Sequence, residues 1–371
     1  MKAAYKFKIV KPIVDGKYTG LSGLRNAIFL AGPCPRKNFD TDDWRFEAFD
    51  ILDDLGFTGT VITPTNPDYG RYEKEAGIGH DAMRMKQVNW ERVAMYAASA
   101  IVFWIPRDSE HPALTTNIEF GEWYKKPNVF AGWPDYAEHN GYFECKLKEQ
   151  GKTFSKTLRE TLQRAVDALN RPTMMYFTSD THFKQQRTFE FSRRPFCDLT
   201  ETDLEMISNW NKNVTCNDVV VHAGDFIDPK HINMLQSLLS SLNFGKLEWT
   251  LGNYDRKIKA DIEKIVADYV AKTGRAIELH DKGDFQFDGP SGKHYAVVHE
   301  PVDFEYTFPE GTIVLYGHIH GRAFAKRNGF DLAIDYHHYT PISMEQVEWF
   351  ANAMQYWDEN VFSDKIRVKT A

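Results

Sequence analysis

The sequence predicts an α/β protein built from two successive halves, and three observations carry this prediction. Short apolar runs alternate with helical patterns from Ala27 to Tyr124, as expected for a parallel sheet with crossover helices. Five further apolar runs lie between residues 174 and 316, and polar residues of metal-binding types follow each of them. The punctuating tripeptide Asn170-Arg171-Pro172 separates the two patterns, so we place a domain boundary near residue 170, between residues 1–170 and 171–371.

The first half contains predicted strands bounded by glycine or proline and helices marked by an apolar stripe. Strands are predicted at Ala27–Ala31, Val61-Ile62 and Ala100–Ile105. Helices are predicted at Asp43–Leu55, Trp90–Ala98, Asn117–Tyr124 and Lys156–Leu169. The polar stretch Thr65–His80 is expected to form a loop over a site, because long loops inside compact domains commonly carry function.

The second half contains five predicted buried strands, rich in Val, Ile, Tyr, Phe and Trp. They are Met174–Ser179, Asp218–Ala223, Leu247–Leu251, His294–Val298 and Thr312–Tyr316. The residues that follow them are Asp180-Thr-His182, Gly224-Asp225, Gly252-Asn253, His299 and Gly317-His318-Ile319-His320. Ligands gather at the carboxyl ends of strands in open α/β sheets. Because two neighbouring divalent ions need a shared carboxylate and flanking imidazole and amide ligands, this pattern predicts a binuclear metal site.

The composition excludes some classes of protein. With 42% hydrophobic and 26% charged residues, the chain is expected to fold as a globular protein. A net charge of −7 argues against nucleic-acid binding, but it allows a small phosphate substrate where metal ions supply positive charge. The four cysteines lack CxxC spacing, which favours reduced thiols in a cytoplasmic protein, or in the host cytoplasm for a phage protein. We expect neither a signal peptide nor a membrane partner.

The ordered motifs DTH, GD, GN, a lone His and GHIH resemble the calcineurin-like metallophosphoesterase family, in its bacterial and phage branch, over about Met174–Ser343. The resemblance implies an α/β/β/α sandwich that hydrolyses phosphate esters with two ions of Mn, Fe, Zn, Ni or Co. The implied ligands of the first metal are Asp180, His182 and His320, those of the second are Asn253, His299 and His318, and Asp225 would bridge the two ions.

One motif departs from the family pattern. The family's GNH[DE] reads Gly252-Asn253-Tyr254-Asp255 here, so the histidine that commonly protonates the leaving group is absent. Tyr254 is the candidate replacement, although a phenol is a weaker acid than an imidazolium. Catalysis and a metal-binding interaction scaffold therefore both stay open. His337 and His338 fall where the family places a segment beside its site, and they are candidates for substrate contact.

Segments of the first half resemble the nucleoside 2-deoxyribosyltransferase-like family over about Ala27–Leu169. They are IFLAGPCPR, DDWR, NWE, IVFWIPRD and LTTNIEFGEW. The resemblance implies a flavodoxin-like parallel sheet and a carboxylate that attacks the anomeric carbon as the base departs. By motif match Glu119 is this nucleophile, at the start of a helix whose dipole would help keep it ionised.

The same resemblance implies a substrate-binding set around Glu119. Asn117 and Asp108 would border the sugar, Glu91 would bind or protonate the base, and Gly32 would leave room for substrate. Trp44 and Arg45 would contact base or phosphate, unless Trp44 is a core residue and Arg45 only pairs with Asp42 or Glu47. Phe29 stands where many family members carry a tyrosine that bonds the nucleophile. Glycosyl transfer, N-glycoside hydrolysis and nucleotide binding alone therefore all stay open.

Both halves suit the same kind of molecule if the substrate is a nucleotide. Our first hypothesis is a bifunctional nucleotide-processing enzyme that joins a phosphoesterase to an N-glycosyl site. The alternatives are a phosphoesterase with a non-catalytic nucleotide-binding domain, and a metal-binding scaffold. The second resemblance also leaves a homo-oligomer open.

Overall fold

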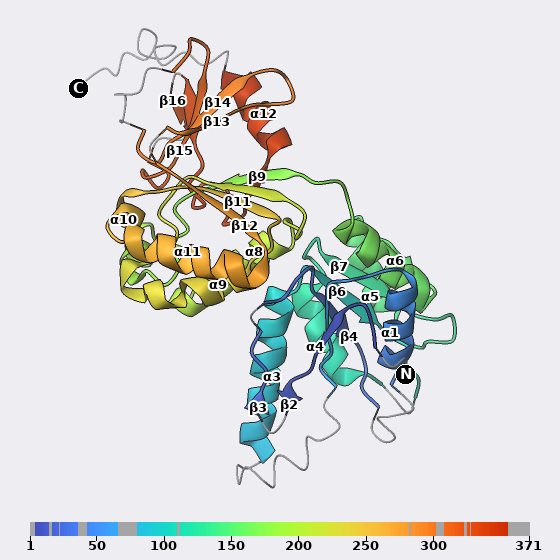
Figure 1. Cartoon of the computed structure of the whole chain (residues 1–371). Helices are drawn as coiled ribbons and strands as arrows, with labels where there is room; N and C mark the ends of the chain where they lie inside the picture. Colours follow the sequence, from blue (N-terminus) through green and yellow to red (C-terminus); the bar gives the residue numbers. More distant parts are fainter. Residues whose placement is uncertain are drawn as a thin grey trace, which may run out of the picture. The chain divides into compact units, whose positions relative to one another are not determined.

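The computed structural model describes residues 4–14, 17–21, 23–35, 43–65, 80–109, 112–281, 283–301, 308–322, 325–326 and 328–354. These residues form two compact units (Figure 1). Unit 1 comprises the chain up to Pro172 with the short segments Asn211–Thr215 and Ser240–Asn243, and unit 2 comprises the remainder. The loop predicted over Thr65–His80 lies, apart from its two end residues, outside the described residues, as does Asp42.

Unit 1 is built on a six-stranded sheet in the order β1-β5-β4-β6-β7-β8, and all its neighbouring strands are parallel. The strands are β1 (Lys8–Val10), β5 (Thr60–Ile62), β4 (Ile28–Ala31), β6 (Ala100–Trp104), β7 (Val129–Gly132) and β8 (Phe154–Ser155). A short hairpin joins β2 (Ile13–Val14) to β3 (Lys17–Tyr18). Without the edge strand β1, the order is the 2-1-3-4-5 of flavodoxin-like sheets.

Helices cover both faces of this sheet because successive strand residues point to opposite sides. In β4, Ile28 and Leu30 belong to a core with α1 (Arg45–Asp54) and α6 (Leu158–Leu169). Phe29 and Ala31 belong to the opposite core, with α3 (His80–Ala97), α4 (Leu114–Trp123) and α5 (Gly141–Glu149). The α/β class predicted from the sequence is confirmed.

Unit 2 contains two five-stranded sheets. One has the order β12-β11-β10-β9-β18, and the other has the order β13-β14-β15-β17-β16. The first comprises β9 (Met175–Thr178), β10 (Val219–His222), β11 (Lys246–Thr250), β12 (Ala276–His280) and β18 (Ile342–Ser343). The second comprises β13 (Phe285–Asp288), β14 (His294–Val297), β15 (Ile313–Tyr316), β16 (Ala325–Lys326) and β17 (Gly329–Asp331). In each sheet the strands that precede the predicted metal ligands are parallel to one another.

The two sheets of unit 2 pack through a shared apolar core to which Phe177 and Val221 contribute from one sheet and Tyr295 and Leu315 from the other. Helices α8 (Leu199–Asn211), α9 (Leu235–Ser241) and α11 (Lys259–Thr273) lie along the first sheet (Figure 1). The other helices are α7 (Gln186–Phe191), η1 (Pro229–Met234), α10 (Asn253–Arg256) and α12 (Met344–Met354). Assignment of this two-sheet arrangement to the metallophosphoesterase fold stays a prediction. In the described part of the chain, no helix has the length and apolar character needed to cross a bilayer.

Candidate functional site

The predicted metal-binding residues of unit 2 form two adjacent groups at the carboxyl ends of their strands. Asp180, His182 and His320 form one group, and within it the candidate ligand atoms lie within 4.8 Å of one another. Asp225, His299 and His318 form the second group by the same measure. The groups adjoin because His182 Nε2 lies 3.5 Å from Asp225 Oδ2. Asn253 belongs to the second group, since its Oδ1 lies 3.1 Å from His299 Nε2 and 3.0 Å from His318 Nδ1.

The residues present fit divalent metal ions. Asp180 Oδ1 and both ring nitrogens of His182 are buried and have no hydrogen-bond partner among the described residues. Burying such groups without partners costs free energy, and a coordinated cation is one way to satisfy them. A set of carboxylate, amide and imidazole donors suits Mn, Fe, Co, Ni or Zn, and it does not distinguish among them.

Electrostatics in this cluster favour positive charge. Burial lowers the pKa of His299, but Asp225 and Asp180 outweigh burial and raise that pKa to about 9. Burial raises the pKa of Asp180, yet the imidazoles of His182, His299 and His320 hold it below its usual range. The carboxylates therefore stabilise a cation at the position where the imidazoles converge, and a divalent ion would supply the same charge.

Partners behind the ligands fix the orientation of their rings. His320 Nδ1 donates to Asp335 Oδ2 at 3.1 Å, and Arg194 Nε donates to the other oxygen of Asp335 at 2.9 Å. His299 Nδ1 donates to the carbonyl of Ala223 at 2.8 Å. In both histidines Nδ1 makes this hydrogen bond, so Nε2 is the nitrogen that faces a carboxylate. Such supporting hydrogen bonds set the tautomer and basicity of metal-binding histidines.

The loops that carry the ligands approach one another unusually closely. A Cβ on Gly252 would lie 2.1 Å from Asp225 Oδ1, and one on Gly317 would lie 2.3 Å from Asp180 Oδ2. Only glycine fits at these two positions. Asp255 ties the loops together, because its carboxylate accepts from the backbone N–H groups of Gly252, Asp225 and Phe226 and from Trp249 Nε1.

The backbone is strained at the ligands themselves. Positive φ angles occur at Asp180 (54°), His182 (43°), Asp225 (58°), His318 (73°) and His320 (47°). Each left-handed non-glycine residue costs on the order of 1–3 kcal/mol, and such residues cluster at functional sites. The concentration of strain on the predicted ligands is a second observation, independent of their spacing, that marks this place as functional.

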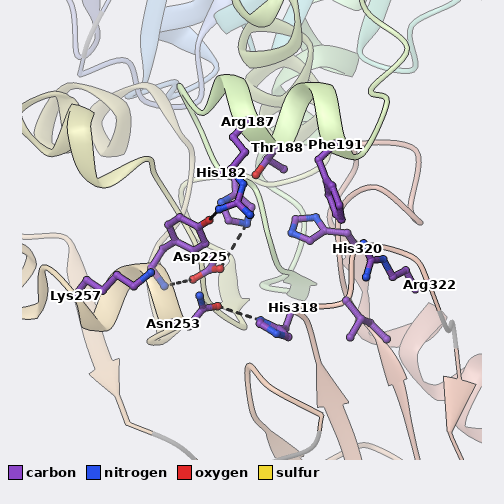
Figure 2. A pocket seen from close by; sticks show the side chains of 12 residues that line it. His182, Arg187, Thr188, Phe191, Asp225, Asn253, Lys257, His318, His320 and Arg322 are labelled. Carbon is purple, nitrogen blue, oxygen red and sulfur yellow. Dashed lines mark hydrogen bonds and ion pairs between the residues drawn. The ribbon is translucent and has the colours of Figure 1, made fainter.

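The ligand groups line a pocket of about 440 Å³, and its rim is cationic (Figure 2). Arg187, Lys257 and Arg322 line this pocket, and none of them forms an ion pair with a described residue. Arg187 Nη1 donates to the hydroxyl of Tyr254 at 2.9 Å, and Lys257 Nζ lies 4.5 Å from the centre of the tyrosine ring. These three cations were not predicted from the sequence, because nothing in their spacing marks them.

Tyr254 lies where its motif predicted, on the wall of the same pocket. Its backbone N–H donates to Asp225 Oδ1 at 2.8 Å, and its ring stands edge-on to His182 at 5.3 Å between centroids. His337 and His338 are not brought into the pocket. His337 is buried, and its Nε2 donates to the carbonyl of Asp331 at 2.9 Å, while His338 is exposed elsewhere.

Unit 1 contains a second pocket, of about 400 Å³, at the carboxyl end of β4. Gly32, Glu91 and Glu119 line it together with Cys34. Burial and the nearby charge of Glu91 raise the pKa of Glu119 to about 8, against the opposing charge of Arg45. Burial also raises the pKa of Glu91, which accepts a hydrogen bond from Gln87 Nε2 at 2.7 Å. The pocket therefore holds two carboxyl groups whose charged forms are disfavoured by burial.

This arrangement corrects the expectation that a helix dipole keeps Glu119 ionised. Helix α4 begins at Leu114, three residues earlier than the predicted start at Asn117. Glu119 consequently lies in the second turn, where the dipole has little effect. Desolvation and like charge decide its pKa instead.

Trp44 and Arg45 support the pocket from behind. Arg45 is 1% exposed, and its guanidinium donates to the carbonyls of Leu30 and Gly32 at 3.0 and 2.9 Å. It pairs with Asp43, which is neither of the two partners that the sequence suggested. Trp44 Nε1 donates to the carbonyl of Pro33 at 3.1 Å. Both side chains thus hold the loop after β4, and neither lines the Glu119 pocket, so their contact with substrate stays a prediction.

The remaining predicted residues of unit 1 do not line the Glu119 pocket. Asn117 Oδ1 accepts from Arg107 Nη1 at 3.0 Å, and Asn117 lines a different pocket. Asp108 is exposed and is not part of either lining. Phe29 is fully buried in the sheet core, so it makes no contact with substrate space.

Gly32 has a φ of 147°, and a Cβ there would lie 2.1 Å from the Trp104 carbonyl oxygen. Glycine is therefore required at the pocket floor.

One comparison with known protein families identifies part of unit 1. Residues 25–136 match the family model described as "Nucleoside 2-deoxyribosyltransferase like". Over 181 residues the chain is 25% identical to "Uncharacterized protein MJ1445" of Methanocaldococcus jannaschii, an alignment that spans 47% of this chain and 88% of that protein. A solved protein of unknown function, AQ665 from Aquifex aeolicus, is 19% identical with a TM-score of 0.36, and the match covers 48% of this chain and all of that one. Residues 25–136 thus form a nucleoside 2-deoxyribosyltransferase-like domain.

Proposed function

We propose that the protein is a nucleotide-processing enzyme whose unit 2 hydrolyses a phosphate ester with two divalent metal ions. The observation that carries this proposal is that two groups of candidate metal ligands lie side by side and contain buried ligand atoms without hydrogen-bond partners. Two arginines and one lysine form the rim of the same pocket, and they have no ion pairs among the described residues. The ligand groups suit cations, and the rim suits the anionic part of a substrate that such cations would also bind.

The side chains of the pocket divide the work. Asp180, His182 and His320 would hold one ion, Asn253, His299 and His318 the other, and Asp225 would contact both. Bound ions would supply Lewis-acid stabilisation of charge on the phosphoryl oxygens. Arg187 and Lys257 would bind further phosphate oxygens and orient the ester, while the Tyr254 hydroxyl faces the pocket as the proton donor to the leaving alkoxide.

A phosphate-release assay tests this proposal. Purified protein with Mn²⁺ is given a panel of nucleoside mono-, di- and cyclic phosphates beside an Asp225→Asn variant. We expect hydrolysis of at least one member, reduced at least about 10³-fold in the variant because several kcal/mol of charge stabilisation is lost. Bound metal without turnover of any ester would favour the interaction scaffold. Turnover that persists in the variant would place the activity elsewhere.

We infer a second activity, cleavage or exchange of the N-glycosidic bond of a nucleoside or nucleotide, for unit 1. The specific support is the enclosure of Glu119 and Glu91 in one pocket of a nucleoside 2-deoxyribosyltransferase-like domain. Ionised Glu119 would attack the anomeric carbon as the carbon–nitrogen bond breaks, and Glu91 would bind the departing base, which takes its proton from water. Water or a second base would then displace Glu119 from the sugar and restore the free carboxylate.

A further inference from the structure

Unit 1 has a third pocket, of about 660 Å³, which neither proposed activity uses. It lies against the face of α4 that carries Asn117, Phe120 and Tyr124, spaced three and four residues apart. Glu119 is on the nearly opposite face of the same helix. The other wall is formed by Arg107 and by the residues Tyr142, Phe143 and Lys146 of α5, with His139 at the preceding turn.

Arg107 is an anomaly in this pocket. It is 5% exposed, and among the described residues it has no carboxylate partner. Its Nε and Nη2 are buried and lack hydrogen-bond partners, and Nη1 donates only to the exposed Asn117 at 3.0 Å. A buried cation without a counter-ion destabilises a fold, so its presence calls for a physical reason. Burial accordingly lowers the pKa of Arg107.

The surroundings of Arg107 suit a ligand with one anionic end and one apolar end. The guanidinium lies 4.5 Å from the centroid of the Phe143 ring, which leaves its planar edge as the recognition element. That edge offers a fork of donors that matches a carboxylate or a phosphate. Aromatic side chains dominate the rest of the lining, and Tyr142 is 71% exposed. Lys146 is engaged by Glu149 at 2.8 Å, so Arg107 is the group that needs an anion.

We propose that this pocket binds a small organic anion whose carboxylate or phosphate pairs with Arg107 and whose aromatic body packs on the exposed ring of Tyr142. Asn117 holds the guanidinium in the ligand-free protein and turns outward, as its exposed position permits, when the anion takes its place. This site is separate from the Glu119 pocket and from the metal-binding groups, and it does not depend on the activity of either.

A thermal-shift titration of metal-free protein tests the proposal. The probes are phenyl phosphate and benzoate, which distinguish the two anionic groups, and benzyl alcohol as the neutral aromatic control. We expect one or both anions, and not the alcohol, to raise the Tm of the wild type. Arg107→Gln should remove that response and weaken binding at least tenfold by calorimetry. Arg187→Gln, a matched change of an arginine at the metal pocket, should retain it.

Stability of the ligand-free variants adds a readout that a purely structural arginine would not reproduce. Removing an uncompensated buried charge should leave the Tm of Arg107→Gln unchanged or higher, whereas a structural role predicts a lower Tm. Arg107→Lys keeps the charge without the fork, and it should fold and bind the anion more weakly than wild type. The proposal is overturned by an absent wild-type response to both anions, by an equal response to the alcohol, or by a response lost only in Arg187→Gln.

Discussion

The metal-ligand pocket of unit 2 and the Glu119 pocket of unit 1 both place carboxyl groups near the carboxyl ends of parallel strands, but neighbouring residues give these groups opposite properties. In unit 2, imidazoles hold the pKa of Asp180 below its usual range, and Asp225 raises that of His299 to about 9. In unit 1, burial and the charge of Glu91 raise the pKa of Glu119 to about 8.

This difference shows how local partners select a chemistry. A cluster of carboxylates and imidazoles with unsatisfied donor atoms stabilises added positive charge and suits metal ions. A pair of desolvated carboxyls without imidazole suits covalent attack on a sugar by one group and binding of the departing base by the other. If the two pockets are distinct in this sense, a substitution in one of them should leave the chemistry of the other unchanged.

Substitution of Glu119 should have the largest effect within unit 1. Glu119→Gln keeps the size of the side chain but removes the nucleophile, so we expect release of free base from a nucleotide to fall by about 10³-fold or more. Chromatography of the base measures this. Phosphate release should be unchanged, and Glu122→Gln, three residues away on the same helix and outside the pocket lining, serves as the matched control. Undiminished base release would remove Glu119 from the mechanism.

Tyr254→Phe should reduce phosphate release by about 10²-fold for esters with poor leaving groups, because a positioned proton donor contributes about 10²–10⁴-fold. Esters of nitrophenol, whose leaving group needs no proton, should react at nearly the wild-type rate. The measurement is the ratio of kcat values for alkyl and nitrophenyl esters of each protein. An equal loss for both kinds of ester would assign Tyr254 a positioning role through its hydrogen bond with Arg187.

Asp335→Asn should weaken metal binding by about 10–100-fold, since Asp335 orients His320 from behind. Calorimetric titration with Mn²⁺ measures the change. Asp203→Asn is the matched control, because Asp203 is also a buried carboxylate paired with a cation, Lys184, at 2.9 Å. Equal weakening in both variants would show that general loss of stability, and not the orientation of His320, is responsible.

Base release should depend on pH through the ionisation of Glu119. Since burial disfavours the charged form, the nucleophile becomes available as the pH rises through about 8. We expect kcat/KM to increase about tenfold between pH 7 and pH 9 and then level off. Glu91→Gln removes the neighbouring charge, so the rise should move to lower pH while the maximal rate falls. A flat profile in the wild type would contradict the raised pKa.

The sequence predicted much of the fold because the strands that precede the predicted metal ligands carry mainly apolar runs. The strands at Met175–Thr178 and Val219–His222 lie within the predicted runs, and so do those at His294–Val297 and Ile313–Tyr316. The predicted ligands follow these strands directly, and that is why a pattern read along the chain places them together in space.

Residues that act through tertiary contacts escaped prediction. Arg194 and Asp335 are 141 positions apart, yet their ion pair positions His320. Arg45 donates to carbonyls of the loop after β4, which its sequence neighbours do not reveal. The environment of Glu119 was mistaken for a similar reason, because its pKa depends on how α3 and α4 bury it together with Glu91.

The most direct test of the central claim, that two independent pockets act on one nucleotide, is a crossed product analysis. Wild type, Glu119→Gln, Asp225→Asn and the double variant are each incubated with Mn²⁺ and a nucleoside 5′-monophosphate, and free base and free phosphate are quantified together. We predict that Glu119→Gln loses only base release, Asp225→Asn loses only phosphate release, and the double variant loses both. Loss of both products in either single variant would contradict two separate sites.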